Sequence, residues 1–155
     1  MSKSLARVEA ALKNAGLLPD IREMGDTRTA ADAAAAVDCE IDQIAKSIIF
    51  RGEESGHVLL FLTAGGNRVD GAKAAALAGQ ALGKADAALI RAETGFAIGG
   101  VAPVGHLREI RAFIDPRLME FARVWAAAGT PRHVFAIAPG DLLRISGAIA
   151  ADFTA

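Results

Sequence analysis

Hydrophobic residues recur at helical intervals near the N-terminus of the chain. Leu5, Val8 and Leu12 follow one another in steps of three or four residues, the spacing that places side chains on one face of a helix. Ser4 precedes this pattern and Gly16 follows it. These positions predict an amphipathic helix over Ser4–Gly16, with Ser4 as its cap and Gly16 as its end.

Polar residues that typically cap helices precede several alanine-rich segments. Thr29 and Asp32 have the spacing of a capping box, which predicts a helix over Ala30–Val37. Similar signals predict a helix from Asp70 through Ala78 and one over Ala87–Thr94, capped by Asp86 and closed by Gly95. Shorter helical segments are predicted over Asp38–Ala45, after Asp115-Pro116, and from Pro139-Gly140-Asp141.

Apolar runs bounded by glycine or proline predict the strands. Ser47–Phe50 and Val58–Thr63 are two such runs, and Gly52–Gly56 between them indicates a hairpin. Because hairpins join antiparallel neighbours, we expect a mixed or antiparallel sheet in an α/β fold of the mixed α+β type. The other predicted strands are Ile21–Met24, Ile110–Ile114, Phe121–Ala128 and His133–Ala138.

Composition and charge narrow the class of protein. The 155 residues are 52% hydrophobic and 23% charged, which fits one globular domain over residues 1–155. The net charge is −1, so the chain gains little from neutralising phosphates, and this argues against a protein that binds DNA by sequence or by charge alone. A nucleic-acid partner would be held only at its end, or with another protein. Arginines between Arg108 and Arg132 form either a locally positive face or an ordinary solvated surface.

The remaining composition excludes several kinds of chemistry. Cys39 is the only cysteine, so no intrachain disulfide can form, and its acidic neighbours favour a buried structural thiol over a reactive thiolate. His57, His106 and His133 lie too far apart to form a local metal-binding motif, so we predict no metal. The chain has no apolar run of ~20 residues, and the N-terminus is amphipathic, so we expect a cytoplasmic protein without a membrane partner.

Established catalytic motifs are absent, but one glycine-rich segment and one lysine stand out. Gly95 to Gly105, followed by His106, is an otherwise apolar run with repeated glycine and with Pro103. Such a segment can press against the core and direct several backbone N–H groups at one oxygen, as ester hydrolysis requires. The alternative is a tight connection without a catalytic role. Lys46 begins an apolar strand and either projects into a pocket or extends into solvent.

Several stretches, in order over nearly the whole chain, resemble the YbaK/prolyl-tRNA-editing family. The resemblance implies a curved, barrel-like mixed sheet surrounded by helices. It implies a free-standing deacylase that removes a small wrong amino acid from tRNA-Pro or a related tRNA, without a cofactor. Its partners would be the acceptor end of the mischarged tRNA and, optionally, a synthetase. The stretches are Thr27–Ala34, Ile44–Phe50, Gly95–Gly105, Gly129–Pro131 and Pro139–Gly147.

The resemblance also implies which residues form the site. The family's pocket lysine corresponds to Lys46, and its glycine-proline loop to Gly99-Gly100-Val101-Ala102-Pro103. The implied catalytic residues are Lys46, Gly99, Gly100, Val101 and Ala102. The implied substrate-binding residues are Thr29, Pro103, Gly105, His106, Gly129, Thr130 and His133.

We expect the loop amides to hold the anionic carbonyl oxygen, and Lys46 to fix the terminal phosphate or ribose. The attacking group would be water or a group of the substrate, because neither glycine segment carries a clear nucleophile. His106 and His133 are either proton acceptors or structural residues. Two features depart from the family pattern. Ser47 stands where some alanine-editing relatives have Asn, and Ala102 stands where a hydroxyl residue is common. Two other functions remain open: a non-catalytic module for aminoacyl-tRNA ends, and a nucleotide binder.

Overall fold

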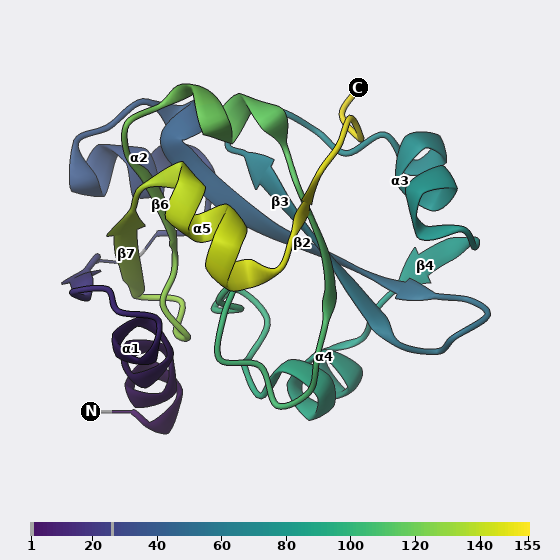
Figure 1. The fold of residues 1–155 in the computed structure, drawn as a ribbon, viewed down its shortest axis with the longest axis horizontal. Coiled ribbons are helices and arrows are strands. Elements are labelled where there is room, and N and C mark those ends of the chain that lie inside the picture. The colour runs from purple at the N-terminus through teal and green to yellow at the C-terminus, as the bar shows by residue number, and fades with distance from the viewer. Residues whose placement is uncertain (1, 26) are drawn as a thin grey trace.

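A single mixed sheet with helices around it organises the computed structural model, which describes residues 2–25 and 27–155 (Figure 1). In that part of the chain the sheet has eight strands and is accompanied by five α-helices. The strands are β1 (Asp20–Glu23), β2 (Ile44–Gly52), β3 (Val58–Ala64), β4 (Leu82–Lys84), β5 (Arg111–Ile114), β6 (Val124–Ala127), β7 (His133–Ile137) and β8 (Ile149–Ala150). The helices are α1 (Lys3–Asn14), α2 (Ala30–Val37), α3 (Gly71–Ala78), α4 (Ala87–Thr94) and α5 (Pro139–Ser146), with 3₁₀ turns η1 (Ile41–Gln43) and η2 (Pro116–Glu120).

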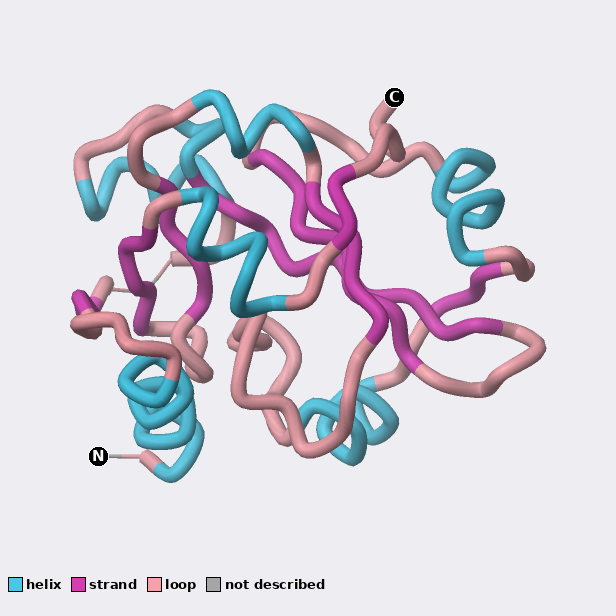
Figure 2. Tube along the Cα trace, in the orientation of Figure 1, coloured by secondary structure: helices cyan, strands magenta, loops and turns pink. Residues whose placement is uncertain are grey.

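The strand β2 is the centre of the sheet. The order is β1-β7-β6-β2-β3-β5-β8, and β4 pairs with the far end of β2. The hairpins β2–β3 and β6–β7 are antiparallel, whereas β2–β6, β3–β5 and β5–β8 are parallel. In Figure 2 the strands cross through the middle of the molecule, α5 lies near the centre of the view, and the other helices lie toward the edge. The sheet is therefore mixed, as the hairpin signals predicted.

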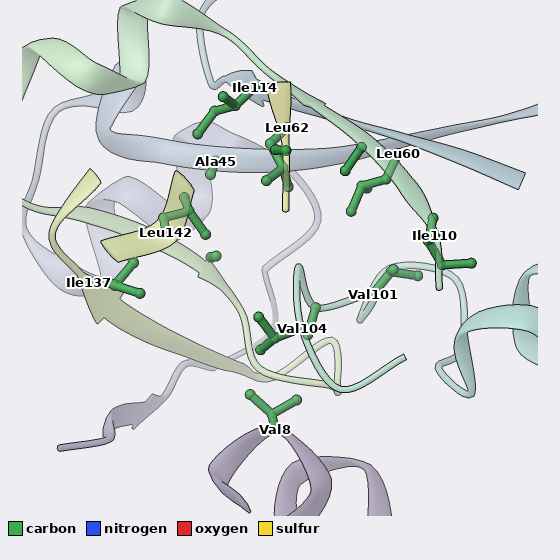
Figure 3. Close-up of a cluster of buried hydrophobic side chains, with 14 of the residues drawn as sticks. Val8, Ala45, Leu60, Leu62, Val101, Val104, Ile110, Ile114, Ile137 and Leu142 are labelled. Atoms are coloured by element: carbon green, nitrogen blue, oxygen red, sulfur yellow. The ribbon is translucent and has the colours of Figure 1, made fainter. Parts of the chain in front are cut away.

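The main core lies where β3 meets helices from both ends of the chain. All seven residues of β3 are buried. Figure 3 shows Leu60 and Leu62 of β3 in one cluster with Val8 of α1 and Leu142 of α5, all of them buried. Burial of each such side chain stabilises the fold by about 1.5–3 kcal/mol. This core also contains buried residues of the glycine-rich segment, so that segment is part of the packed interior.

Most of the predicted helix starts are confirmed by their hydrogen bonds. The side chain of Thr29 accepts a hydrogen bond from the N–H of Asp32 at 3.1 Å. Asp70 and Asp86 cap α3 and α4 in the same way, and Gly95 ends α4 with φ of 81°. The cap of the first helix was wrongly predicted: Ser2, rather than Ser4, accepts from the N–H of Leu5.

The boundaries of other elements differ from the sequence prediction. Only Ile41–Gln43 is helical within the predicted turn Asp38–Ala45, because Ile44 and Ala45 already pair with β6. The segment Phe121–Ala128 forms a strand only over Val124–Ala127, where β7 offers partners. The short strands β4 and β8 were not predicted, since each depends on pairing with a strand distant in sequence. In the described part of the chain no helix is long and apolar enough to cross a bilayer.

Candidate functional site

A cavity of about 380 Å³ opens beside the first half of β2. Its boundaries are β2, the start of α2, the loop that follows α4, and the turn between β6 and β7. The lining includes small and branched apolar side chains together with hydroxyl, imidazole and cationic groups. This composition, apolar with a few polar groups, is typical of a small-molecule or group-binding pocket. Its polar residues include Thr29, Lys46, Ser47, Thr130 and His133.

Lys46 is the third residue of β2 and lines the cavity. It lies inside the strand and pairs with Thr63 of β3, because β2 begins at Ile44, two residues before Lys46, and not at Lys46 as predicted. Its Nζ donates a hydrogen bond of 2.7 Å to the backbone oxygen of Asn67. Burial lowers the pKa of Lys46, and the nearby Arg68 guanidinium lowers it further. An ammonium has three donors, so two remain for a ligand.

The turn that receives Lys46 is itself firmly held. The buried carboxylate of Asp115 accepts hydrogen bonds from the N–H of Ala64 at 3.1 Å and from Nδ2 of Asn67 at 2.9 Å. From the opposite side, Asp42 accepts from the N–H of Gly66 at 2.8 Å. Hydrogen bonds to a carboxylate are stronger than those between neutral groups. The oxygen that orients Lys46 therefore belongs to a fixed turn.

The glycine-rich segment, Gly95–Gly105, forms another side of the cavity through Gly99 and Val101. Val101 and Ala102 are almost fully buried, so the segment packs against the core as predicted. Gly100 donates its N–H to the oxygen of Ala97 at 3.0 Å. Among the described residues, the N–H groups of Gly99 and Val101 donate to no acceptor. Two unpaired amide donors therefore belong to residues that line the cavity.

Ser47 joins this segment to the central strand. Its hydroxyl donates a 2.7 Å hydrogen bond to the backbone oxygen of Val101. Because Lys46 and Ser47 are neighbours in β2, the same strand fixes both the ammonium and one point of the glycine-rich segment. The two predicted elements of the site are thus brought to one cavity.

The turn after β6 completes the opposite side. A side chain at Gly100 would place its Cβ 2.7 Å from the carbonyl carbon of Thr130, so only glycine fits without a backbone shift. The hydroxyl of Thr130 lies 2.6 Å from Nδ1 of His133 and accepts from the N–H of Arg132 at 3.2 Å. Gly129 has a φ of 97° and lies behind the cavity, against the backbone of Ser4.

Other residues of the predicted site lie elsewhere. Pro103, Gly105 and His106 line a second, more open pocket of about 610 Å³ with the ends of α1 and α5. Nε2 of His106 lies 2.6 Å from the backbone oxygen of Ala102. A carbonyl oxygen can only accept, so Nε2 carries the proton. Burial lowers the pKa of His106 and favours this neutral form.

The cavity also contains cations that the sequence prediction missed. Arg28 and Lys84 line it with Lys46, whereas no carboxylate lines it among the described residues. Lys84 stands opposite Phe50 at the pairing of β4 with β2. In the sequence each of the two lysines follows a small residue, Ala45 or Gly83, but only the long-range pairing of β4 with β2 brings them to one cavity. The excess of positive charge suits an anionic ligand.

The buried Trp125 forms part of the cavity lining. The guanidinium carbons of Arg22 and Arg123 lie 4.8 and 5.1 Å from the centre of its ring. In the described part of the chain its Nε1 has no hydrogen-bond partner.

Cys39 is half-buried and packs against the same cluster as Trp125, and burial raises the pKa of its thiol, which agrees with a structural role. No group of three or more His, Cys, Asp or Glu residues that could hold a metal occurs among the described residues.

The chain is similar in sequence and in structure to several known proteins. The sequence model of the aminoacyl-tRNA editing domain family matches residues 25–145. The crystal structure of a candidate trans-editing enzyme for prolyl-tRNA synthetase superposes with a TM-score of 0.92 at 44% identity, covering 100% of this chain and 99% of that one. A scaffold protein from a study of epitope grafting gives a TM-score of 0.93 at 43% identity, with coverage of 100% and 99%. The uncharacterized protein YwhH of Bacillus subtilis (strain 168) is 30% identical over 118 residues, 76% of this chain and 74% of YwhH.

Proposed function

The chain belongs to the family of aminoacyl-tRNA editing domains, and we propose that it is a trans-acting deacylase that hydrolyses the ester of a mischarged tRNA. The proposed substrate is a small wrong amino acid on tRNA-Pro or a related tRNA. The likeness to the candidate trans-editing enzyme, over the length of both chains, supports this choice. The observation that carries the proposal is the cavity that unites Lys46 with the free amides of Gly99 and Val101.

In this proposal the terminal nucleotide carries the ester into the cavity. The ammonium of Lys46 binds its phosphate or ribose through the two donors that Asn67 leaves free. The absence of lining carboxylates among the described residues supports an anionic ligand here. The small apolar side chains of the lining leave room for a small amino acid.

Water then adds to the ester carbon, and negative charge develops on the carbonyl oxygen. The N–H groups of Gly99 and Val101 stabilise this charge, because fixed donors cost no reorganisation during the reaction. The N–H of Gly100 is not a donor in this scheme, since it already bonds to Ala97. The tetrahedral intermediate collapses with release of the ribose oxygen, which takes up a proton.

His133 is the proposed proton acceptor for the attacking water. It lines the cavity, whereas His106 lines the second pocket and bonds to Ala102. The contact with Thr130 orients the imidazole ring of His133. A 2′- or 3′-hydroxyl of the substrate can serve in place of His133, and His133→Ala distinguishes the two: loss of activity supports the imidazole, and full activity supports the substrate hydroxyl.

The test is a panel of tRNAs, each carrying one small non-cognate amino acid, incubated with purified protein while ester loss is followed. We expect loss on one or two pairs only. Gel-shift binding of the same tRNAs without any ester loss would instead identify a non-catalytic binding module, and stabilisation by free nucleotides alone would identify a nucleotide binder. Non-hydrolysable aminoacyl-adenosine analogues should protect Lys46 from acylating reagents while leaving the exposed Lys13 reactive.

A further inference from the structure

The side chain of Arg7 contacts both ends of the glycine-rich segment. Its Nε donates a 2.7 Å hydrogen bond to the backbone oxygen of Gly105, and its Nη2 lies 3.5 Å from the oxygen of Thr94. The guanidinium carbon lies 4.4 Å from the centre of the Phe96 ring. One planar cation on α1 thus joins the two points where the segment leaves and re-enters the rest of the fold.

Glycine stands at both ends of the segment, next to Arg7. A side chain at Gly95 would collide with Nη2 of Arg7, whereas one at Gly105 would make only ordinary van der Waals contact with Arg7. Both glycines also have positive φ, 81° and 78°, which other residues rarely adopt. A side chain at Gly95 would therefore disturb the contact with Arg7, and a side chain at either glycine would strain the backbone.

The helix α1 also supports the other side of the cavity. Gly129 packs on the backbone of Ser4, where an added Cβ would lie 2.7 Å from the Ser4 oxygen. The buried Val8 points from α1 toward Val104 of the glycine-rich segment (Figure 3). Yet α1 precedes residues 25–145, the part that matches the family's sequence model. A helix outside the matched region thus packs behind both glycine-containing sides.

We propose that Arg7 is a positioning residue for deacylation: it closes the ends of the glycine-rich segment so that Gly99 and Val101 present their N–H groups to the cavity. The middle of the segment is held by Ser47 and His106, through the oxygens of Val101 and Ala102. Its ends have only Arg7 as a side-chain hydrogen-bond donor among the described residues. The catalytic part of this inference rests on the proposed function.

The test compares Arg7→Met and Arg7→Lys with Lys13→Met, a control on the exposed side of the same helix. We expect Arg7→Met to lower kcat about tenfold with little change in KM, since small displacements of reacting groups are costly. Arg7→Lys keeps the charge but cannot span two carbonyls, so we expect a loss of about threefold. Lys13→Met should match the wild type.

Hydrogen exchange of the amides at 99–105 provides a readout that does not need activity. Exchange should accelerate in Arg7→Met and less in Arg7→Lys, with the strands β2 and β3 unchanged. If Arg7→Met does not fold, the Arg7→Lys variant carries the test. Wild-type kcat and exchange in either folded arginine variant would overturn the proposal. If the wild type deacylates no tRNA while exchange still responds to Arg7, the positioning of the segment stands and the proposed function fails.

Discussion

The two main sides of the cavity are built on different principles. Lys46 and Ser47 belong to β2, which pairs with β3 along one edge and with β6 and β4 along the other. The glycine-rich segment pairs with no strand among the described residues, and side chains that donate to its backbone oxygens hold it in place. The strand that carries Lys46 thus depends on a continuous ladder, whereas the position of the free amides depends on core packing and a few separate hydrogen bonds. Single substitutions should therefore disturb the second side more easily than the first.

The largest expected effect is the loss of the ammonium itself. Lys46→Ala should lower kcat/KM for a mischarged tRNA by about 100-fold, the scale of one lost charge-stabilising donor. The ladder pairing of β2 uses only backbone groups at this residue, so the melting temperature should stay close to that of the wild type. Deacylation assays and thermal denaturation measure the two quantities, with Lys13→Ala as the matched control. Full activity in folded Lys46→Ala would refute a role for this lysine.

A methyl group at the contact between the two loops should have the next largest effect. Gly100→Ala would force the glycine-rich segment away from Thr130, because the new Cβ meets backbone atoms that cannot rotate aside. We expect destabilisation of about 1–3 kcal/mol, as for other overpacked sites, and a fall in kcat of about tenfold. Gly140→Ala, where an added Cβ meets nothing within 4 Å, is the control. Equal behaviour of the two variants would contradict the tight contact.

Removal of the bond between the two sides should have a smaller effect. Ser47→Ala deletes the donor to the oxygen of Val101, a contribution of about 1 kcal/mol. The corresponding loss in kcat is about fivefold if the bond is fully used in the transition state. Steady-state kinetics would test this, and Ser47→Thr, which retains a hydroxyl, should recover part of the activity. A Ser47→Ala variant with wild-type kcat would show that the ladder and Arg7 suffice.

The smallest expected effect is a pH dependence. Burial and Arg68 lower the pKa of Lys46, so its ammonium loses its proton at a lower pH than an exposed lysine does. Binding that depends on this charge should weaken as the pH rises, so kcat/KM should decline at a lower pH than the titration of an exposed lysine would give. Parallel measurement of spontaneous ester loss corrects for the lability of the substrate. Retention of the alkaline decline in Lys46→Ala would assign it to another group.

The same contrast explains how far the sequence could predict this molecule. Hydrophobic periodicity and caps such as Thr29, Asp70 and Asp86 are local, so the helices and the main hairpins were predicted within a few residues. The short strands β4 and β8 have no local pattern, and they form only because β2 and β5 offer free edges. Such tertiary pairing cannot be read from a single sequence.

For the site, the sequence identified the residues but did not show which cavity each of them lines. Lys46 and Gly99 line one cavity, as their proposed roles require, whereas His106 lies in a second pocket because its ring bonds to Ala102. Gly105 and His106 are close to Gly99 in sequence, but the chain has already reached the second pocket at Pro103. The support from Arg7 was not foreseen, because nothing in the spacing of residues 7, 94 and 105 indicates contact.

The buried indole of Trp125 gives the cavity an intrinsic optical reporter. The chain has one tryptophan and no tyrosine, so its fluorescence above about 300 nm comes from a single side chain. That side chain lines the cavity, and two guanidinium groups lie close to its ring. A molecule that enters beside it will alter the colour and intensity of the emitted light, and occupancy of the unlabelled protein can therefore be followed in real time in a cuvette.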